Sequence, residues 1–337
     1  MTFNPFSAIK HGRFTHFGGL STTVIVTLVL NCPAAGREID KSVSETPSEA
    51  KAPVEFRNDA PASDAWKRFS ELSIWEDGLS EMCYYDATCN LLDKPRKYTR
   101  VHMMNRQYMD TTFFIKASKH TKAPRPAFQF IISEEIPTDN YNYRFLITAF
   151  MERPSLRPIK VAVSSQEWCG TTVKYLTWER HKEVPPKNWS LDVCCYSYLP
   201  TEGDRWFPHA DKAYIDAYES LFVYARAVVA SGGEARPMKL LKCMHTNHMP
   251  DPEPLDATLR VEGQARKIKV PLGKFTAQRV VLDWKDAPTW FDVETAPPYR
   301  LLAFRADNVE AKLRFVERRA YWDHNAPSGF YKKGQAP

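Results

Sequence analysis

A five-residue segment holds side chains that could perform thiol chemistry. In Gln166-Glu167-Trp168-Cys169-Gly170, the Cys169 thiol could attack a carbonyl carbon, the Gln166 amide could donate to the resulting oxyanion, and Glu167 adds a carboxylate. A thiol nucleophile also needs a base, and the spacing singles out none of the candidate histidines: His102, His181, His209, His245, His248 and His324. We therefore favour a structural interpretation, in which a strand ends in a turn, Trp168 fills the core and Cys169 is buried or disulfide-bonded.

A second segment gathers side chains that copper or zinc would accept. Cys243, His245 and His248 fall within six residues, and on a strand Cys243 and His245 would share a face. The spacing matches no structural zinc pattern, which needs paired ligands from two places. We therefore expect a strand that runs out into a loop, with no metal and no other cofactor.

Acidic residues and glycine-rich motifs are the features that would indicate other classes of enzyme. A paired-carboxylate hydrolase would need two acids close in space, and solvated strand faces explain the acids more simply. These acids are Asp77, Glu81, Asp86, Glu134, Glu135 and Asp283. The sequence has no Gly-x-Ser-x-Gly, Walker-type or dinucleotide-binding glycine motif, which argues against serine hydrolases, P-loop enzymes and Rossmann folds.

Alternating apolar and polar residues predict the elements that position these groups. The clearest strand covers 143–152, where Tyr143, Phe145 and Ile147 share one face. Similar stretches cover 99–105, 128–133, 159–165, 173–178, 191–198, 259–261 and 313–316. Turns at 271–273 and 297–298 predict two hairpins. Helical spacing predicts a helix over 211–230, and a short helix is expected to begin at Ser63 or Asp64.

These elements predict a mainly β fold of the α+β type. We expect an antiparallel β-sheet, either one curved sheet or two blocks, with one packed α-helix. The β-rich domain should span 63–324, with strand blocks at 78–200 and 237–322 joined by the helix. A flexible linker at 37–62 precedes it, and a tail at 325–337 follows.

The amino terminus is typical of a secretion signal. Basic residues precede an apolar run at 20–30 and small residues follow it, so we expect a signal peptide over 1–36 and an extracytoplasmic location, in the periplasm or outer envelope. The alternative is lipid attachment at Cys32, which would anchor the protein to a membrane. Outside the leader six cysteines remain, which allow up to three disulfides or simply buried thiols. Adjacent Cys194 and Cys195 should point to opposite faces of a strand.

Two groups of motifs resemble known families. Trp75-Glu76-Asp77-Gly78-Leu79-Ser80-Glu81 and Ser164-Ser165-Gln166-Glu167-Trp168-Cys169-Gly170 resemble a family of uncharacterised bacterial secreted proteins and lipoproteins, over about residues 74–178. Segments 270–275, 290–292 and 298–302 are similar to a periplasmic β-sheet domain family of unknown function. The resemblance implies an envelope location and a β architecture, and it brings no activity.

Composition favours a binding role over catalysis. The chain has 9 Trp, 15 Tyr and 19 Phe, and a curved sheet lined with aromatic rings can hold a lipid or another amphiphile, with Trp168 and Trp75 as candidate contacts. The net charge of +6 is spread along the chain, which argues against a nucleic-acid partner. The first hypothesis is a non-enzymatic envelope protein that binds a lipophilic or cell-surface ligand or has a structural role. The alternative is a secreted hydrolase or thiol enzyme centred on Cys169.

Overall fold

The computed structural model describes residues 64–112, 114–153, 155–178 and 189–323. The predicted leader 1–36, the linker 37–62, the lipidation candidate Cys32 and the tail 325–337 lie outside the described residues. Within the described part of the chain, no helix is both long enough and apolar enough to cross a membrane.

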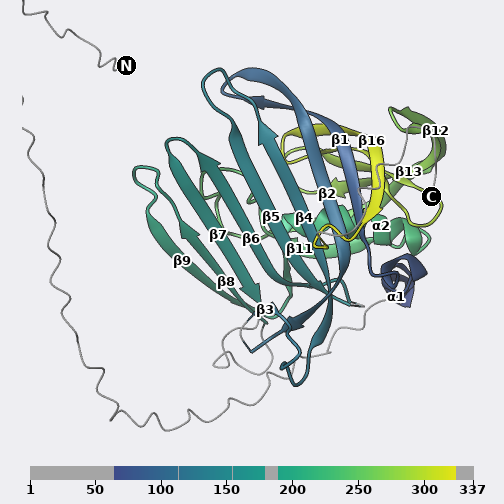
Figure 1. Ribbon diagram of the computed structural model, residues 1–337, viewed down its shortest axis with the longest axis horizontal. Coiled ribbons are helices and arrows are strands. Elements are labelled where there is room, and N and C mark those ends of the chain that lie inside the picture. Colours follow the sequence, from purple (N-terminus) through teal and green to yellow (C-terminus); the bar gives the residue numbers. More distant parts are fainter. Residues whose placement is uncertain (1–63, 113, 154, 179–188, 324–337) are drawn as a thin grey trace, which may run out of the picture. The chain divides into compact units, whose positions relative to one another are not determined.

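One antiparallel sheet of 16 strands dominates the fold (Figure 1). The first half contributes β1 (Ser80–Leu91), β2 (Lys94–Asp110), β3 (Ile115–Lys116), β4 (Arg125–Ile136), β5 (Tyr143–Glu152), β6 (Pro158–Glu167), β7 (Gly170–Trp178), β8 (Trp189–Tyr196) and β9 (Asp204–Asp211). The second half contributes β10 (Ile215–Asp216), β11 (Arg236–Leu240), β12 (Leu255–Val270), β13 (Gly273–Asp283), β14 (Thr289–Glu294), β15 (Leu301–Ala306) and β16 (Val309–Arg319). The mainly β prediction is confirmed, as are both hairpin turns, which join β12 to β13 and β14 to β15.

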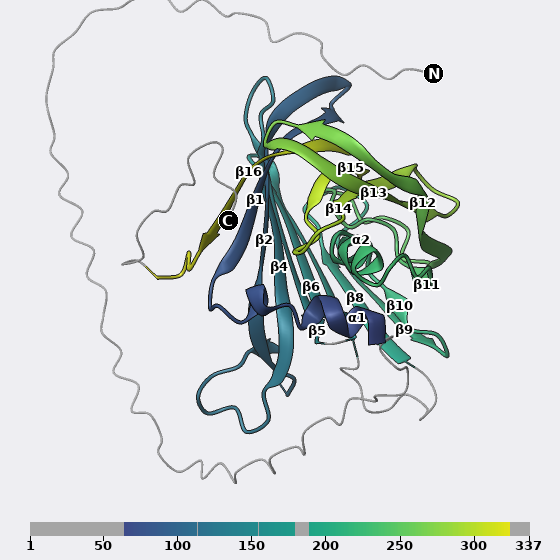
Figure 2. The same ribbon diagram turned by 90° about the vertical axis from the view of Figure 1, so that its right-hand side faces the viewer.

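The two strand blocks form a single curved sheet, because β16 pairs with β1. The sheet runs from β10 at one edge to β9 at the other, and its one parallel pair joins β10 to β11. Only three residues separate β9 from β10 along the chain, so both edges of the sheet lie near the same connection. Figure 2 shows the result: one wall carries β1, β2, β4 and β5, and the other carries β12 to β15. The sheet is therefore barrel-like and nearly closed.

Helix α2 (Leu221–Ala230) occupies the space between the two walls (Figure 2). Every residue from Leu221 to Val228 is buried, as expected for a helix that is apolar on most sides. Phe222 packs against Phe130, Phe291 and Phe304, which come from both walls. The interior of the sheet is thus filled by protein, and this is where the main core lies.

The predicted helix over 211–230 is wrong in its first half. Residues 211–217 contain the end of β9, a turn and β10, and the helical part begins with a 3₁₀ turn, η2 (Tyr218–Ser220). The helical spacing of the apolar residues was overridden by tertiary pairing, because Ile215 and Asp216 pair with Lys239 and Leu240 at the sheet edge.

The short amino-terminal helix is α1 (Asp64–Ser70), which a 3₁₀ turn, η1 (Ser73–Trp75), follows. Trp66 and Phe69 are buried, and the Trp75 indole Nε1–H donates to the Phe69 carbonyl at 2.8 Å. Trp75 is only 1% exposed. It is therefore a core residue, and its assignment as a ligand contact is wrong.

Antiparallel order places several hairpin turns at the same end of the sheet. These are the β1–β2, β4–β5, β6–β7, β8–β9 and β15–β16 turns. We call this the turn end. Residues 155–157, which precede β6, and the connection at 212–214 lie at the opposite end.

Candidate functional site

An irregular segment, residues 241–249, crosses the interior near the turn end, and we call it the closing segment. Buried side chains satisfy its backbone groups. The Met244 N–H donates to the Glu219 carboxylate at 2.7 Å, and the Lys174 ammonium donates to the carbonyls of Met244 at 2.9 Å and Thr246 at 2.5 Å. Because irregular backbone is costly to bury without such partners, these contacts hold the segment in one place.

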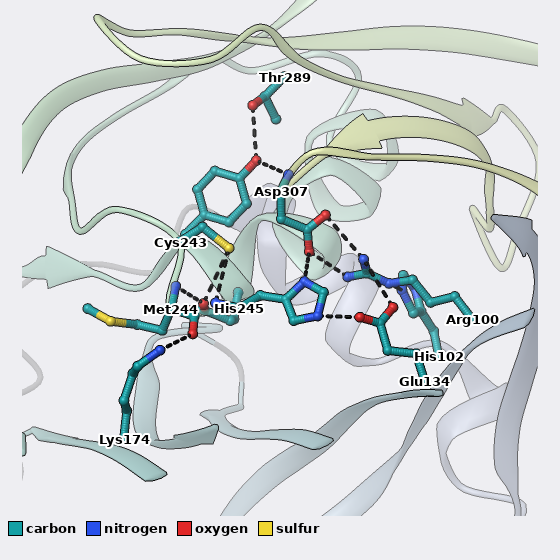
Figure 3. A network of polar contacts seen from close by, with 11 residues as sticks. Arg100, His102, Glu134, Lys174, Cys243, Met244, His245, Thr289 and Asp307 are labelled. Atoms are coloured by element: carbon teal, nitrogen blue, oxygen red, sulfur yellow. Dashed lines mark hydrogen bonds and ion pairs between the residues drawn. The ribbon is translucent and has the colours of Figure 1, made fainter. Parts of the chain in front are cut away.

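The imidazole of His245 anchors the closing segment in a buried charge network (Figure 3). His245 Nδ1 lies 3.0 Å from Asp307 Oδ2, and Nε2 contacts the Glu134 carboxylate. Arg100 binds Asp307 with two hydrogen bonds, at 3.1 and 2.8 Å, and lies 3.7 Å from Glu134. The side chains of these four residues are at most 4% exposed. Two cations thus face two anions, and the network joins β2, β4, the β15–β16 turn and the closing segment.

Further hydrogen bonds orient Arg100 and Asp307 within the network. The Arg100 Nε–H donates to His102 Nε2 at 3.0 Å, so the neutral His102 ring carries its proton on Nδ1. The Asp307 backbone N–H donates to the Tyr218 hydroxyl at 3.0 Å, and that hydroxyl also lies 3.0 Å from Thr289 Oγ1. The turn that carries Asp307 is therefore held from both sides.

Opposite charges outweigh burial in setting the pKa values of the network. Burial alone would lower the pKa of His245, but the Glu134 charge and the hydrogen bond to Asp307 raise it to about 9. Burial would raise the pKa values of Glu134 and Asp307, but His245 and Arg100 hold both below their ordinary values. At neutral pH all four groups are therefore charged.

The network predicts how stability changes with pH. The pKa of His245 is about 9 when folded and about 6.5 when unfolded, so the stabilisation it provides is complete below about pH 6.5 and is lost as the pH rises to 9. We expect the urea midpoint to fall between pH 6.5 and 8. A His245→Gln variant should lack this fall, and a wild-type midpoint that rises over this interval would contradict the assignment.

Other groups set the limits of that pH window. Burial lowers the pKa of Lys174 to about 8. Above pH 8 Lys174 loses its proton, which removes the free-energy cost of burying its charge and stabilises the fold, so Lys174 opposes the loss of stability caused by His245. On the acid side, the contributions of Glu134 and Asp307 are present above their ordinary pKa values and are lost as the pH falls below them. Burial also lowers the pKa of His102, which adds to the loss of stability at acid pH.

The three candidate metal ligands, Cys243, His245 and His248, do not converge. Both ring nitrogens of His245 face carboxylates, His248 Nδ1 lies 2.7 Å from Glu202, and the Cys243 thiol faces Glu219. Within the described ranges, no group of three or more His, Cys, Asp or Glu side chains could hold a metal ion. The predicted strand at 243–245 is irregular backbone instead, because it forms the closing segment.

Cys83, Cys89, Cys169, Cys195 and Cys243 carry free thiols. Cys195 is buried on the inner face of β8, and Cys194 lies on the opposite face and is only partly buried. The predicted opposite orientation of these neighbours is therefore confirmed.

Trp168 and Cys169 form the two-residue β6–β7 turn, in which Glu167 pairs with Gly170. Trp168 is 84% exposed and Cys169 is also exposed. The expectation that Trp168 fills the core and Cys169 is buried is therefore wrong. The physical reason is the turn itself, because its two residues project beyond the last paired residues of the sheet.

An exposed aromatic column carries Trp168 above the turn end. The Trp168 ring stacks on Tyr141 with centroids 5.5 Å apart, and Tyr141 stacks on Tyr143 at 5.6 Å. The inner member, Tyr143, is buried. The buried Tyr143 supports Tyr141, and stacking on Tyr141 orients the exposed indole.

A row of polar side chains lies beside the column. Cross-strand register aligns Glu135, Arg144, Gln166 and Thr171 over β4, β5, β6 and β7. Together with Tyr141, Asn142, Glu167 and Trp168 they line a pocket of about 430 Å³. Glu135 accepts hydrogen bonds from Asn142 at 2.6 Å and Arg144 at 3.2 Å. The pocket therefore combines an aromatic wall with donors and acceptors.

The closing segment supports this pocket through Glu167. The Asn247 side-chain amide donates to the Glu167 carboxylate at 3.0 Å, and the Tyr198 hydroxyl donates to the same oxygen. Asn247 follows the buried His245 by two residues, so the charge network and the exposed turn are connected by one short stretch of chain.

The geometry around Cys169 lacks a base for thiol catalysis. Its sulfur lies 2.9 Å from the Tyr141 hydroxyl, and no described histidine hydrogen-bonds to it. The contact with Cys169 raises the pKa of Tyr141, so this phenol stays protonated at neutral pH and cannot accept the thiol proton. Gln166 and Glu167 belong to the pocket described above rather than to an oxyanion site.

Gly170 is required by a close approach in this turn. A Cβ at Gly170 would come within 2.6 Å of Tyr198 Cδ2, whereas a Cβ at Gly273 in another hairpin would meet Phe275 at an ordinary 3.5 Å. We expect Gly170→Ala to lower the free energy of unfolding by about 1–3 kcal/mol, the usual cost of overpacking. Urea unfolding should show a smaller loss for Gly273→Ala, and equal losses would argue against this packing.

Two members of the charge network, Arg100 and Asp307, are not among the candidates predicted from the sequence. Arg100 and His102 share the inner face of β2 with Met104, so two polar residues on a face that should be apolar were an available signal. Asp307-Asn308 is a two-residue turn with both φ angles positive, which Asp and Asn tolerate, and this turn signal also went unused.

The fold and the site together define a mainly β protein, whose single barrel-like sheet carries an exposed aromatic and polar pocket at its turn end. No family model and no curated protein matches the chain. A similar solved structure is the β-barrel-like protein of domain of unknown function DUF1849 from Brucella abortus, which is 8% identical, with a TM-score of 0.43 over 71% of this chain and 98% of that chain.

Proposed function

We propose that this is an exported envelope protein that binds glycan chains at the Trp168 pocket. The observation that carries the proposal is the indole of Trp168, which is 84% exposed yet held by stacking beside a polar pocket. An aromatic face beside convergent polar groups is the combination that orients a ligand in a binding site.

Sugar rings match both halves of the pocket. One face of a pyranose presents C–H groups, which stack favourably on the negative face of an indole. Its hydroxyl groups both donate and accept hydrogen bonds. In the pocket, the Glu135 carboxylate can accept hydrogen bonds and the Arg144 guanidinium can donate them. The side-chain amides of Asn142 and Gln166 can do both.

The interior of the sheet does not support binding of a lipid between its two walls. Helix α2 and the aromatic cluster around Phe222 occupy the space where an acyl chain would lie. We therefore favour a cell-surface ligand over a lipophilic one at the Trp168 pocket.

Export is part of the same proposal. The basic and apolar leader and the resemblance of two motifs to secreted proteins and lipoproteins support it, and a glycan-binding surface suits a protein outside the cytosol. Lipid attachment at Cys32 remains the alternative to cleavage, and the mass of the mature amino terminus distinguishes them.

The experiment is a calorimetric titration of the purified protein with three probes: chitohexaose, cellohexaose and soluble peptidoglycan glycan strands. We expect saturable binding to at least one, and no binding to phosphatidylglycerol vesicles at the same site. Failure of all three glycans to bind would overturn the proposal.

A further inference from the structure

A second cavity lies at the end of the sheet opposite the closing segment. It measures about 660 Å³, within the range of small-molecule sites. Residues 155–157 and 213–214 border it, together with α1, β11 and β12. Its lining includes Trp66, Arg157, Tyr214, Arg236 and Met238.

Aromatic rings hold one cation of this cavity, Arg157, for which the described residues provide no anionic partner. The Arg157 guanidinium lies 4.8 Å from the ring centroids of both Trp189 and Tyr214, and these two rings are nearly perpendicular, at 79°. No carboxylate among the described residues pairs with Arg157. Two aromatic faces thus orient a guanidinium whose hydrogen-bond donors are not used by any described carboxylate.

The other cations around the cavity are already neutralised. Arg236 lies between Trp66 and Tyr224 and pairs with Asp216 at 3.1 Å. The exposed rim carries two further ion pairs, Lys239–Asp256 at 2.8 Å and Arg260–Asp283 at 2.5 Å. Among the described cations of the lining, Arg157 is therefore the one that a ligand charge would neutralise.

We propose that this cavity binds a small amphiphilic carboxylate, with its carboxylate on Arg157 and its apolar part in the cavity. A guanidinium fork matches a planar carboxylate with two parallel hydrogen bonds. Apolar surface for the remainder of the ligand comes from the exposed Ala213, Ala235 and Pro237 and from the half-buried Tyr214. The paired acids at the rim disfavour ligands of higher negative charge. This site is independent of the Trp168 pocket.

The test is calorimetric titration of the full chain with decanoate below its micellar concentration. Decanol tests the apolar part alone and acetate tests the carboxylate alone. We expect decanoate to bind at least tenfold more tightly than either, because a charge-assisted pair and an apolar contact are both required. Absence of decanoate binding, or equal affinity for decanol, would overturn the proposal.

Two variants assign the binding to Arg157. Arg157→Met should weaken decanoate binding at least tenfold, and Arg157→Lys, which keeps the charge, should weaken it less. Arg144→Met, in the Trp168 pocket, is the matched control and should leave decanoate binding unchanged. If Arg157→Met fails to fold, the Arg157→Lys variant and the comparison with decanol still decide the question. Unchanged affinity in a folded Arg157→Met variant would contradict the assignment.

Discussion

Replacing His245 with alanine is expected to lower the free energy of unfolding by about 3–5 kcal/mol, the cost of removing one partner from a buried ion pair. The two carboxylates of Glu134 and Asp307 would then share the single charge of Arg100 in a site that excludes water. Urea denaturation of the purified variant at pH 6.5 measures the effect.

His248→Ala is the matched control for that experiment. His248 lies three residues further along the same closing segment and also faces a carboxylate, but its side chain is 63% exposed. An exposed pair contributes at most about 1 kcal/mol, so this variant should unfold nearly as the wild type does. Equal losses for the two histidines would mean that the buried network does not anchor the segment.

Replacing Trp168 with alanine should abolish most glycan binding without affecting the fold. A tryptophan at the centre of a binding site commonly contributes about 2 kcal/mol or more, which corresponds to a roughly 30-fold loss of affinity. Because Trp168 is 84% exposed, its removal creates no cavity in the core, and the unfolding transition should not move.

Trp322→Ala is the matched control for Trp168→Ala. Trp322 is 48% exposed and lies outside the pocket, so its replacement should leave glycan affinity unchanged. A variant lacking Trp168 that still bound glycans with wild-type affinity would place the binding surface elsewhere.

The strands were predictable because one face of the sheet is buried. Period-two alternation marks Tyr143, Phe145 and Ile147 as inward-facing, and all three are buried in β5. Closure of the two blocks into one sheet depends on pairing between β1 and β16, whose residues are more than 200 positions apart. Local alternation carries no information about such a partner.

The candidate site was only partly predictable, for reasons that differ between its residues. The segment 166–170 was singled out for its chemistry, and it does lie at the exposed pocket. The orientation of Trp168 depends on a turn of only two residues, and a shift of one position in the register would have buried it. The charge network needs Arg100, Glu134, His245 and Asp307 to meet from four distant segments, which no spacing in the sequence reveals.

The most direct measurement is the indole Nε1–H spectrum of the ¹⁵N-labelled protein during titration with a glycan that binds. Assignment of the Trp168 signal follows from its absence in Trp168→Phe. If Trp168 contacts the glycan, its signal shifts in proportion to saturation while the Trp322 signal stays in place. A saturating titration that leaves the Trp168 signal unmoved would contradict this contact.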